Sequence, residues 1–293
     1  MTENENGEIE YRMVYERRNE MDKQVLLIND LAGYGKVALS AMIPVLSHMG
    51  YNLYNLPTAL VSNTLDYGKF DILETTDYMR NTIGVWKELG FHFNAISTGF
   101  IVSESQAGLI AEYCREQAEN GTQIFVDPIM GDEGTLYNGV TEQTVAHMRK
   151  LTAVADYIVP NYTEAVYLAG MPYQADGITK AEAGRLIDRL KEIGAGSVIV
   201  TSACVDGEDT VIGYDEKTGE LFFRPFTLVP VRFPGTGDIF SSVLMGKVLA
   251  GEGLRESTQK AMDIVKEMIV KNRDSVDKFK GIPVEVCLEL IDR

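Results

Sequence analysis

The sequence predicts an α/β fold in which a mostly parallel central sheet ends in an antiparallel edge and carries helices on both faces. Two patterns along the chain support this prediction. Up to about residue 200, short apolar runs alternate with longer helical stretches, and two strand-like runs then follow each other with only a turn between them. Alternating strands and helices favour parallel strands, because a parallel connection needs a crossover that a helix usually provides.

The elements can be assigned in order from their apolar patterns. Runs typical of buried strands occupy residues 25–28, 94–96, 123–126, 157–159 and 198–200. Helical patterns occupy residues 72–89, 104–119 and 181–193. Residues 210–214 and 221–226, joined by a turn at 215–219, predict the antiparallel edge, and helices close the chain from residue 238 onward.

Length, composition and charge limit the possible functions. The chain has 293 residues, of which 45% are hydrophobic and 24% charged, and we expect one domain at residues 23–293 after an acidic N-terminal tail at residues 1–22. No apolar run is long enough to span a bilayer, and the acidic N-terminus does not resemble a secretory signal, so we expect a cytoplasmic protein. A net charge of −16 disfavours binding to nucleic acid or to anionic membranes.

Polar residues directly follow each predicted parallel strand. They are Asn29 and Asp30, Thr98 and Gly99, Asp127 and Pro128, Pro160 and Asn161, and Thr201 and Ser202. Ligands of open α/β sheets bind beyond the carboxyl ends of the strands. The sequence therefore predicts a small-molecule site at this edge of the sheet.

The segment FPGTGDIF, residues 233–240, places two glycines and a carboxylate at a predicted helix start. The backbone N–H groups of Gly235, Thr236 and Gly237, together with the helix N-terminus, could hold an anion that develops during a reaction. Asp238 could then accept a proton from an attacking hydroxyl group, as phosphoryl transfer to an alcohol requires. The alternative is that Asp238 only caps the helix, and the tetrapeptide alone favours both interpretations equally.

Asp127 and the segment NYTE at residues 161–164 also allow two interpretations each. An acid at a strand end can hold Mg²⁺ through water, but Asp127 and Pro128 can also form a turn. Asn161 can cap the next helix while Glu164 closes a capping box, which is the better interpretation of the tetrapeptide alone. This segment follows a strand end and lies near Asp127 in the predicted fold. That position supports a metal or nucleotide role as well as the capping interpretation.

Residues 33–38, GYGKVA, fit the dinucleotide-binding pattern G-x-G-x-x-A. Such a site also needs an acid about 20 residues further on to hold a ribose. Residues 53–60 contain no acid, so the sequence disfavours an NAD-dependent enzyme. The cysteines and histidines lack the spacing of a zinc site.

Taken together, the motifs resemble those of the ribokinase superfamily. They are DPIMG at residues 127–131, Asn161-x-x-Glu164 and GTGD at residues 235–238, in this chain order. The segments LLINDLAGYG at residues 26–35 and LPTALVSNTLDYG at residues 56–68 resemble more closely the pyridoxal (vitamin B6) kinases of that superfamily. The resemblance covers residues 25 to about 271 and implies a ribokinase-like three-layer sandwich with kinase activity.

The resemblance also implies a role for each matching residue. Asp238 would take the proton from the hydroxymethyl group of the substrate, and Gly235, Thr236 and Gly237 would form the anion hole for the γ-phosphate. Asp127, Asn161 and Glu164 would act on the Mg²⁺–triphosphate side, with Asp127 and Glu164 at the metal, and Thr201 and Ser202 would contact phosphate or nucleotide. Asp30, Val37, Ala59, Val61 and Phe100 would line the substrate pocket. ATP, Mg²⁺, a homodimer and a response to K⁺ are implied in the same way.

The implied reaction is phosphorylation of the hydroxymethyl group of pyridoxal, pyridoxamine or pyridoxine to the 5'-phosphate, in salvage of the B6 cofactor. The first alternative is a hydroxymethylpyrimidine (phosphate) kinase of thiamine synthesis, which shares the fold and the chemistry. The second is a non-catalytic nucleotide-binding regulator of the same fold.

At two positions the chain departs from many pyridoxal kinases. Asp30 stands where they carry serine and Leu65 where they carry threonine, and both positions touch the substrate in that family, so the preferred vitamer stays open. A carboxylate only accepts hydrogen bonds, so Asp30 could pair with the protonated ring nitrogen or with the amine of pyridoxamine. Alternatively, Asp30 could cap the turn toward Gly33.

Overall fold

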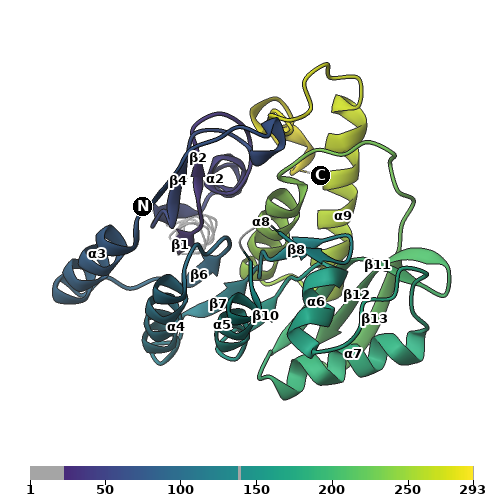
Figure 1. The fold of residues 1–293 in the computed structure, drawn as a ribbon, viewed down its shortest axis with the longest axis horizontal. Helices are drawn as coiled ribbons and strands as arrows, with labels where there is room; N and C mark the ends of the chain where they lie inside the picture. Colours follow the sequence, from purple (N-terminus) through teal and green to yellow (C-terminus); the bar gives the residue numbers. More distant parts are fainter. Residues whose placement is uncertain (1–22, 138–139, 293) are drawn as a thin grey trace, which may run out of the picture.

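The computed structural model describes residues 23–137 and 140–292, so the predicted tail at residues 1–22 lies outside the described residues. Within them, an eight-stranded sheet forms the centre of the molecule and carries helices on both faces (Figure 1). In spatial order its strands are β13 (Glu220–Pro225), β12 (Glu208–Asp215), β11 (Ser197–Val205), β10 (Tyr157–Ile158), β7 (Gln123–Val126), β6 (Ala95–Thr98), β1 (Gln24–Ile28) and β3 (Asn52–Asn55). The predicted α/β fold is confirmed.

The pairing of the strands follows the prediction. The strands from β3 to β11 are parallel, whereas β12 pairs antiparallel with β11 and with β13. The predicted turn closes this hairpin, because the N–H of Gly219 donates to the carbonyl of Asp215 at 2.8 Å. The carboxyl ends of β1, β6, β7, β10 and β11 therefore lie along one edge of the sheet.

Two hydrophobic cores lie on opposite faces of the sheet. Residues alternate between them along each inner strand, so that Leu26 and Ile28 belong to one core and Val25 and Leu27 to the other. The first core is covered by α3 (Thr76–Leu89), α4 (Glu104–Ala118), α5 (Glu142–Thr152), α6 (Tyr162–Ala169) and α7 (Lys180–Glu192). The second is covered by α2 (Leu39–His48), α8 (Thr236–Leu249) and α9 (Leu254–Asn272), with the short turns η2 (Val284–Val286) and η3 (Leu288–Leu290).

A small sheet lies beside the carboxyl end of β1. It consists of β2 (Leu31–Ala32), β4 (Ala59–Val61) and β5 (Ile72–Glu74), and the turn η1 (Leu65–Tyr67) connects the last two. The predicted helix at residues 72–89 is wrong in its first four residues, because Ile72–Glu74 pairs antiparallel with β4 and Thr75 is the N-cap. The backbone partners supplied by β4 outweigh the local helical pattern, and the helix begins only at Thr76.

A second small hairpin follows β7 and precedes α5. It pairs β8 (Gly131–Asp132) with β9 (Thr135–Leu136). The N–H of Gly134 at its tip donates to the hydroxyl of Thr163 in the first turn of α6 at 2.9 Å. The hairpin is thereby held over the start of α6.

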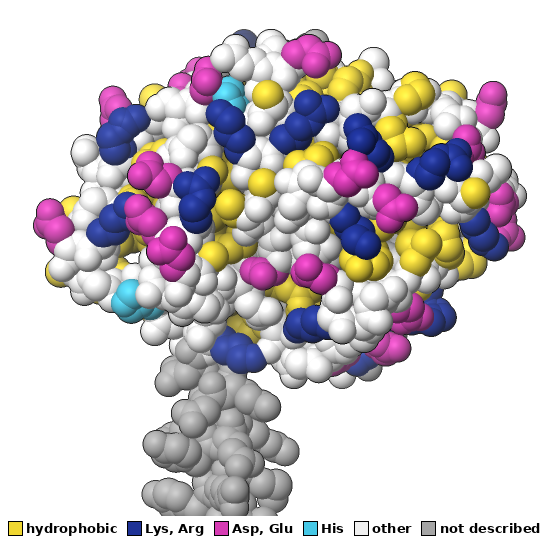
Figure 2. All heavy atoms as spheres, turned by 90° about the horizontal axis from the view of Figure 1, so that it is seen from below, with side chains coloured by type: hydrophobic (Ala, Val, Ile, Leu, Met, Phe, Trp, Pro, Cys, Tyr) yellow, Lys and Arg dark blue, Asp and Glu magenta, His cyan; other side chains and the backbone are white. Residues whose placement is uncertain are grey.

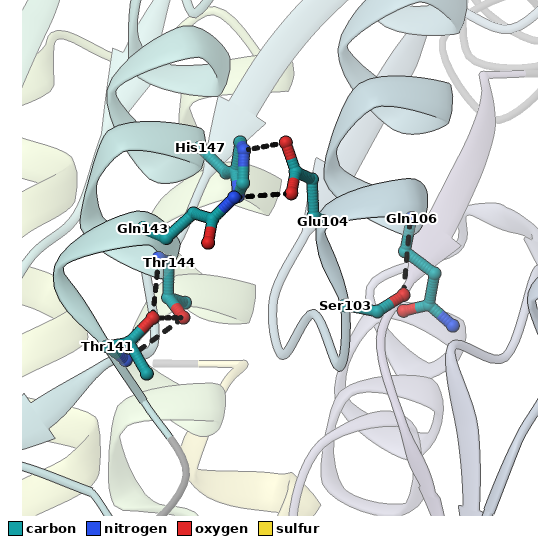
Figure 3. A network of polar contacts seen from close by, with 7 residues as sticks. All are labelled: Ser103, Glu104, Gln106, Thr141, Gln143, Thr144 and His147. Carbon is teal, nitrogen blue, oxygen red and sulfur yellow. Dashed lines mark hydrogen bonds and ion pairs between the residues drawn. The ribbon is translucent and has the colours of Figure 1, made fainter.

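A polar network joins the N-terminal end of α4 to α5 (Figure 3). Glu104 accepts a hydrogen bond from Gln143 at 2.6 Å and lies 2.9 Å from Nε2 of the nearly buried His147. Ser103 caps α4 by accepting from the N–H of Gln106. These contacts fix the start of α4, which directly follows the segment that carries Phe100.

The surface is mixed in character on the face shown in Figure 2. Acidic, basic and hydrophobic side chains are interspersed there over the described part of the chain. None of the helices that the structure describes combines the length with the apolar composition needed to cross a bilayer.

Candidate active site

Asp238 lies in the first turn of α8, at the edge of the sheet where the sequence predicts a site. The N-cap of this helix is Gly235, whose φ of 84° is a left-handed conformation that favours glycine. The Asp238 carboxylate does not cap its own helix; one oxygen instead accepts a hydrogen bond from the N–H of Ala38 at 2.8 Å. The capping interpretation of Asp238 is therefore wrong, and the carboxylate links two segments that are distant in sequence.

Three carboxyl groups lie near one another at this point. Burial raises the pKa of Asp238 to about 6. Burial and the charge of Asp238 raise the pKa of Asp127 to about 7, and the same two causes raise the pKa of Asp30 to about 7. Carboxylates that repel one another in a half-buried site favour a cation or a protonated ligand between them.

Asp127 follows β7 directly and accepts a hydrogen bond from the hydroxyl of Ser241 on α8 at 2.9 Å. Ser241 lies three residues after Asp238, so both side chains come from one face of α8. The start of α8 therefore carries the Asp238 carboxylate and also holds the carboxylate of Asp127 at the end of β7.

The predicted capping box at the start of α6 is confirmed. Asn161 accepts from the N–H of Glu164 at 3.0 Å, and Glu164 accepts from the N–H of Asn161 at 2.8 Å. The second oxygen of Glu164 accepts from the N–H of Met130 at 3.0 Å. Glu164 is only 3% exposed, and burial together with the charge of Asp127 raises its pKa well above the usual value.

The segments that follow β7 and β10, and the bulge of β11 that contains Thr201 and Ser202, border one large cavity of about 1040 Å³. Nine of the residues predicted for catalysis or for the nucleotide and metal side line it: Asp127, Asn161, Glu164, Thr201, Ser202, Gly235, Thr236, Gly237 and Asp238. The far wall consists of the segment 225–234 and of Met262, Lys266 and Ile269 on α9. This wall was not predicted, because neither segment carries a recognisable motif.

The five residues predicted for the substrate pocket, Asp30, Val37, Ala59, Val61 and Phe100, do not line this cavity. Asp30 and Phe100 are joined through Asn29, whose side-chain oxygen accepts from the N–H groups of both, at 2.9 and 2.8 Å. Val37 precedes Ala38, and its Cα would lie 3.2 Å from a Cβ placed on Gly235. The acceptor side and the anion hole are therefore in direct contact.

Ala59 and Val61 lie on the buried face of β4, with Leu60 exposed between them. The carbonyl of Val61 accepts from the N–H of Gly33 at 2.7 Å. The N–H of Gly33 is therefore not available to the Asp30 carboxylate, which disfavours the alternative that Asp30 caps this turn.

Ser241 and Arg232 at the site were not predicted from the sequence, and Asn29 was predicted only as one of the polar residues at the ligand-binding edge, without a role of its own. Asn29 carried a signal, because a polar residue directly after a buried strand at a ligand-binding edge is a candidate for contact with the site. Ser241 carried a weaker one in its spacing from Asp238. Arg232 and Lys266 are the cationic residues among the described residues that line the cavity.

Two groups on the cavity wall fit a divalent cation. Asp127 and Glu164 lie close enough for the charge of one to raise the pKa of the other, so a cation between them would relieve their repulsion. Over the described residues, no group of three or more His, Cys, Asp and Glu side chains has the arrangement of a metal site. A site with few carboxylates suits Mg²⁺, which keeps several waters and shares its coordination with substrate phosphates.

Comparisons with known proteins agree with this geometry. The model of the phosphomethylpyrimidine kinase family matches residues 39–282. The structure of a protein from Bacteroides thetaiotaomicron, assigned as a phosphomethylpyrimidine kinase, is 34% identical, with a TM-score of 0.87 over 93% of this chain and 94% of that one. An orthorhombic crystal form of that protein contains pyridoxal.

Two pyridoxal kinases are also similar. That of Rubrobacter xylanophilus is 28% identical over 245 residues, which are 80% of this chain and 82% of the relative. The structure of that from Lactobacillus plantarum is 27% identical, with a TM-score of 0.82 over 92% of this chain and 96% of that one. These likenesses confirm the ribokinase-like fold that the motifs implied.

Proposed function

Because the chain belongs to the phosphomethylpyrimidine kinase family, we propose that it transfers the γ-phosphoryl group of ATP to the hydroxymethyl group of a B6 vitamer. The observation that carries the proposal is the contact between the Asp238 carboxylate and Ala38, which holds an acid of raised pKa at the N-terminus of α8 beside Gly235. The acceptor is proposed to be pyridoxal, pyridoxamine or pyridoxine. This choice is supported by relatives named pyridoxal kinase and by the relative that was crystallised with pyridoxal.

In the proposed reaction Asp238 is the general base. As the acceptor oxygen forms its bond to the γ-phosphorus, its O–H bond breaks and the proton passes to the Asp238 carboxylate. The bond between the γ-phosphorus and the β–γ bridging oxygen breaks, and ADP leaves with the electron pair. The N–H groups of Gly235, Thr236 and Gly237, at the positive end of the α8 dipole, stabilise the charge on the transferring group.

Asp127 and Glu164 are proposed to hold Mg²⁺, with Asn161 orienting Glu164 through the capping box. When bound, the cation neutralises charge on the β- and γ-phosphates. Thr201 and Ser202 border the same part of the cavity and are proposed to contact phosphate. Arg232, which lies between the segment 225–231 and the anion hole, supplies positive charge in a cavity where Lys266 is the other cationic residue among the described residues.

The adenine ring is proposed to bind at the far end of the cavity. Met262, Val265 and Ile269 of α9, together with Phe226 and Leu228, give part of the cavity an apolar lining, which suits a flat aromatic ring. The triphosphate would then run from Lys266 and Arg232 toward Gly235. This direction ends at Asp238, where the acceptor side begins.

A panel of acceptors tests the proposed function. ATP consumption would be measured with each B6 vitamer, with hydroxymethylpyrimidine and its phosphate, with ribose and without acceptor. We expect turnover with at least one vitamer. The proposed response to K⁺ is tested in the same assay by replacing K⁺ with Na⁺. Turnover with hydroxymethylpyrimidine alone would favour the second candidate, a thiamine-pathway kinase, which the matching family model supports. Nucleotide binding without turnover would favour a regulator.

Asp30 is proposed to bind the protonated ring nitrogen or the amine of the vitamer. Replacement of Asp30 by alanine is expected to raise KM for the vitamer by about tenfold or more, because a charge-assisted bond is lost. Asp30→Ser should restore part of the loss for pyridoxal and less for pyridoxamine. Steady-state kinetics with all three vitamers measures this, and the exposed Asp66→Ala is the matched control.

The stability of the same variants separates binding from a structural role. Burial raises the pKa of Asp30 above its unfolded value, so folding becomes less favourable as pH rises from about 4 to about 7. Asp30→Ala should therefore keep or raise Tm at pH 8. A lower Tm combined with an unchanged KM would make Asp30 a structural residue.

We propose that residues 23–293 form one kinase domain, that it is a homodimer and that it acts in the cytoplasm. The single-domain proposal is supported by the two cores that share one central sheet. Support for the dimer comes from the outer face of the small sheet, where Leu60 and Leu73 are opposite each other in the register and are 43% and 61% exposed. A second copy covering these leucines would remove apolar surface from water.

Light scattering after size-exclusion chromatography tests the dimer. The wild-type protein is expected at twice the chain mass, and Leu73→Asp at the chain mass, because a buried charge at the interface would be unpaired. Val276→Asp, at a fully exposed residue outside the small sheet, is the control and should remain dimeric. A wild-type monomer, or a dimeric Leu73→Asp variant, would contradict this interface.

A further inference from the structure

Asn29 is a buried carboxamide directly after β1, with 2% of its surface exposed. Its side-chain oxygen accepts two hydrogen bonds, from the N–H of Asp30 at 2.9 Å and from the N–H of Phe100 at 2.8 Å. Only the oxygen of a carboxamide can accept from N–H donors, so these two bonds fix which end is the oxygen. The NH₂ group must point in the opposite direction.

That NH₂ group points toward Asp238. Its nitrogen lies 3.5 Å from Oδ1 of Asp238 and 3.5 Å from the sulfur of Met42. A thioether is a weak acceptor, so the carboxylate is the stronger partner. A Cβ placed on Gly99 would lie 2.3 Å from Nδ2, so glycine at this position leaves the space that the carboxamide occupies.

The second oxygen of Asp238 is held independently. It accepts from the N–H of Ala38, whose φ of 47° is unusual for a residue other than glycine. One donor therefore comes from the segment after β1 and the other from the start of α2. Between them they determine the orientation of the carboxylate plane.

We infer that Asn29 is a positioning residue for phosphoryl transfer, which holds the base Asp238 in register with the acceptor-side residues Asp30 and Phe100. The inference rests on the proposed function and deepens it. The side chain of Asn29 contacts the base Asp238. It also contacts the two segments, at Asp30 and at Phe100, that would contact the acceptor ring. Small displacements between a base and the hydroxyl that it deprotonates lower the rate strongly.

The charges around Asp238 explain why an amide suits this position. Asp30 and Asp127 both face Asp238, and each carboxyl group has a raised pKa for which the Asp238 charge is a contributing cause. The donors from Asn29 and Ala38 act in the opposite direction and stabilise the ionised form of Asp238. A third carboxylate in place of Asn29 would add to the repulsion.

The isosteric variant Asn29→Asp isolates the donor. It keeps an oxygen that can accept from Asp30 and Phe100 but replaces the NH₂ group by oxygen. We expect kcat to fall about 10- to 100-fold with KM for ATP within about twofold of the wild-type value, because the nucleotide cavity is not altered. In a plot of kcat against pH, the rise on the acidic side should shift to higher pH. Asn94→Asp is the matched control, since Asn94 also accepts from a backbone N–H, that of Gln24 at 2.7 Å, at the opposite end of the sheet.

A kcat within about threefold of wild type in Asn29→Asp, or a fall without a shift of the pH profile, would overturn the inference. If Asn29→Asp does not fold, Asn29→Ser replaces it, because a hydroxyl can still accept from one backbone N–H but cannot reach Asp238.

A readout without turnover keeps this test separate from that of the proposed function. The fall in Tm caused by Asn29→Asp should be smaller in the Asp238→Asn background, where no second carboxylate is present to repel it. Additive changes in Tm would overturn the contact between the two side chains. A wild-type protein that phosphorylates no acceptor would instead contradict the proposed function, whatever the Tm values show.

Discussion

Replacement of Asp238 by asparagine is expected to lower kcat by about 10³-fold or more while ATP binding stays near the wild-type level. The amide is nearly the same size but cannot take the proton from the acceptor hydroxyl group. It can still accept the hydrogen bond that Ala38 donates, so the start of α8 should keep its position. Steady-state kinetics with the preferred vitamer and calorimetric titration with ADP measure the two effects separately.

The pH dependence of the wild-type enzyme provides a second test of Asp238. A general base acts in its ionised form, and burial raises the pKa of Asp238 to about 6. We expect kcat to rise with pH through this region and to level off above about pH 7, whereas the residual rate of Asp238→Asn should lack this limb. Near wild-type turnover in Asp238→Asn would contradict the assignment of the base.

Replacement of Gly235 by alanine is expected to lower kcat by about 100-fold or more and to lower Tm. Gly235 has a φ of 84°, and a Cβ at this position would lie 2.2 Å from the carbonyl oxygen of Lys36. Such a contact is too short to persist, so the backbone must move. That movement displaces the N–H groups that would stabilise the transferring phosphoryl group.

Gly251→Ala is the matched control for this variant. Gly251 follows the end of α8 with a φ of 91°, and nothing lies within 4 Å of a Cβ placed there. The control therefore carries the cost of a left-handed alanine, about 1 kcal/mol, without the clash. We expect it to lose a little stability and no activity. Equal activity in the two variants would show that the Gly235 backbone does not contribute to catalysis.

The sequence by itself determined the features that depend on neighbours along the chain. The apolar runs predicted the inner strands, since burial on both faces produces continuous apolar segments. The spacing of Asn161 and Glu164 predicted the capping box, because both of its bonds close within one helical turn. The order of the motifs also indicated the superfamily. The superfamily in turn indicated which strand ends should carry the site.

Only the tertiary structure decided which of these residues meet. Asn29 and Asp238 are separated by 209 positions, and Ser241 and Asp127 by 114. The segment 72–74 became a strand because β4 lies beside it, and the segment 225–234 became a cavity wall together with residues of α9 that are distant in sequence. Contacts of this kind depend on the spatial order of the strands and on the packing of α8 against the sheet. The strand order and the packing of α8 leave no periodic pattern in the sequence. Both are determined by the free energy of the whole fold and not by any local segment.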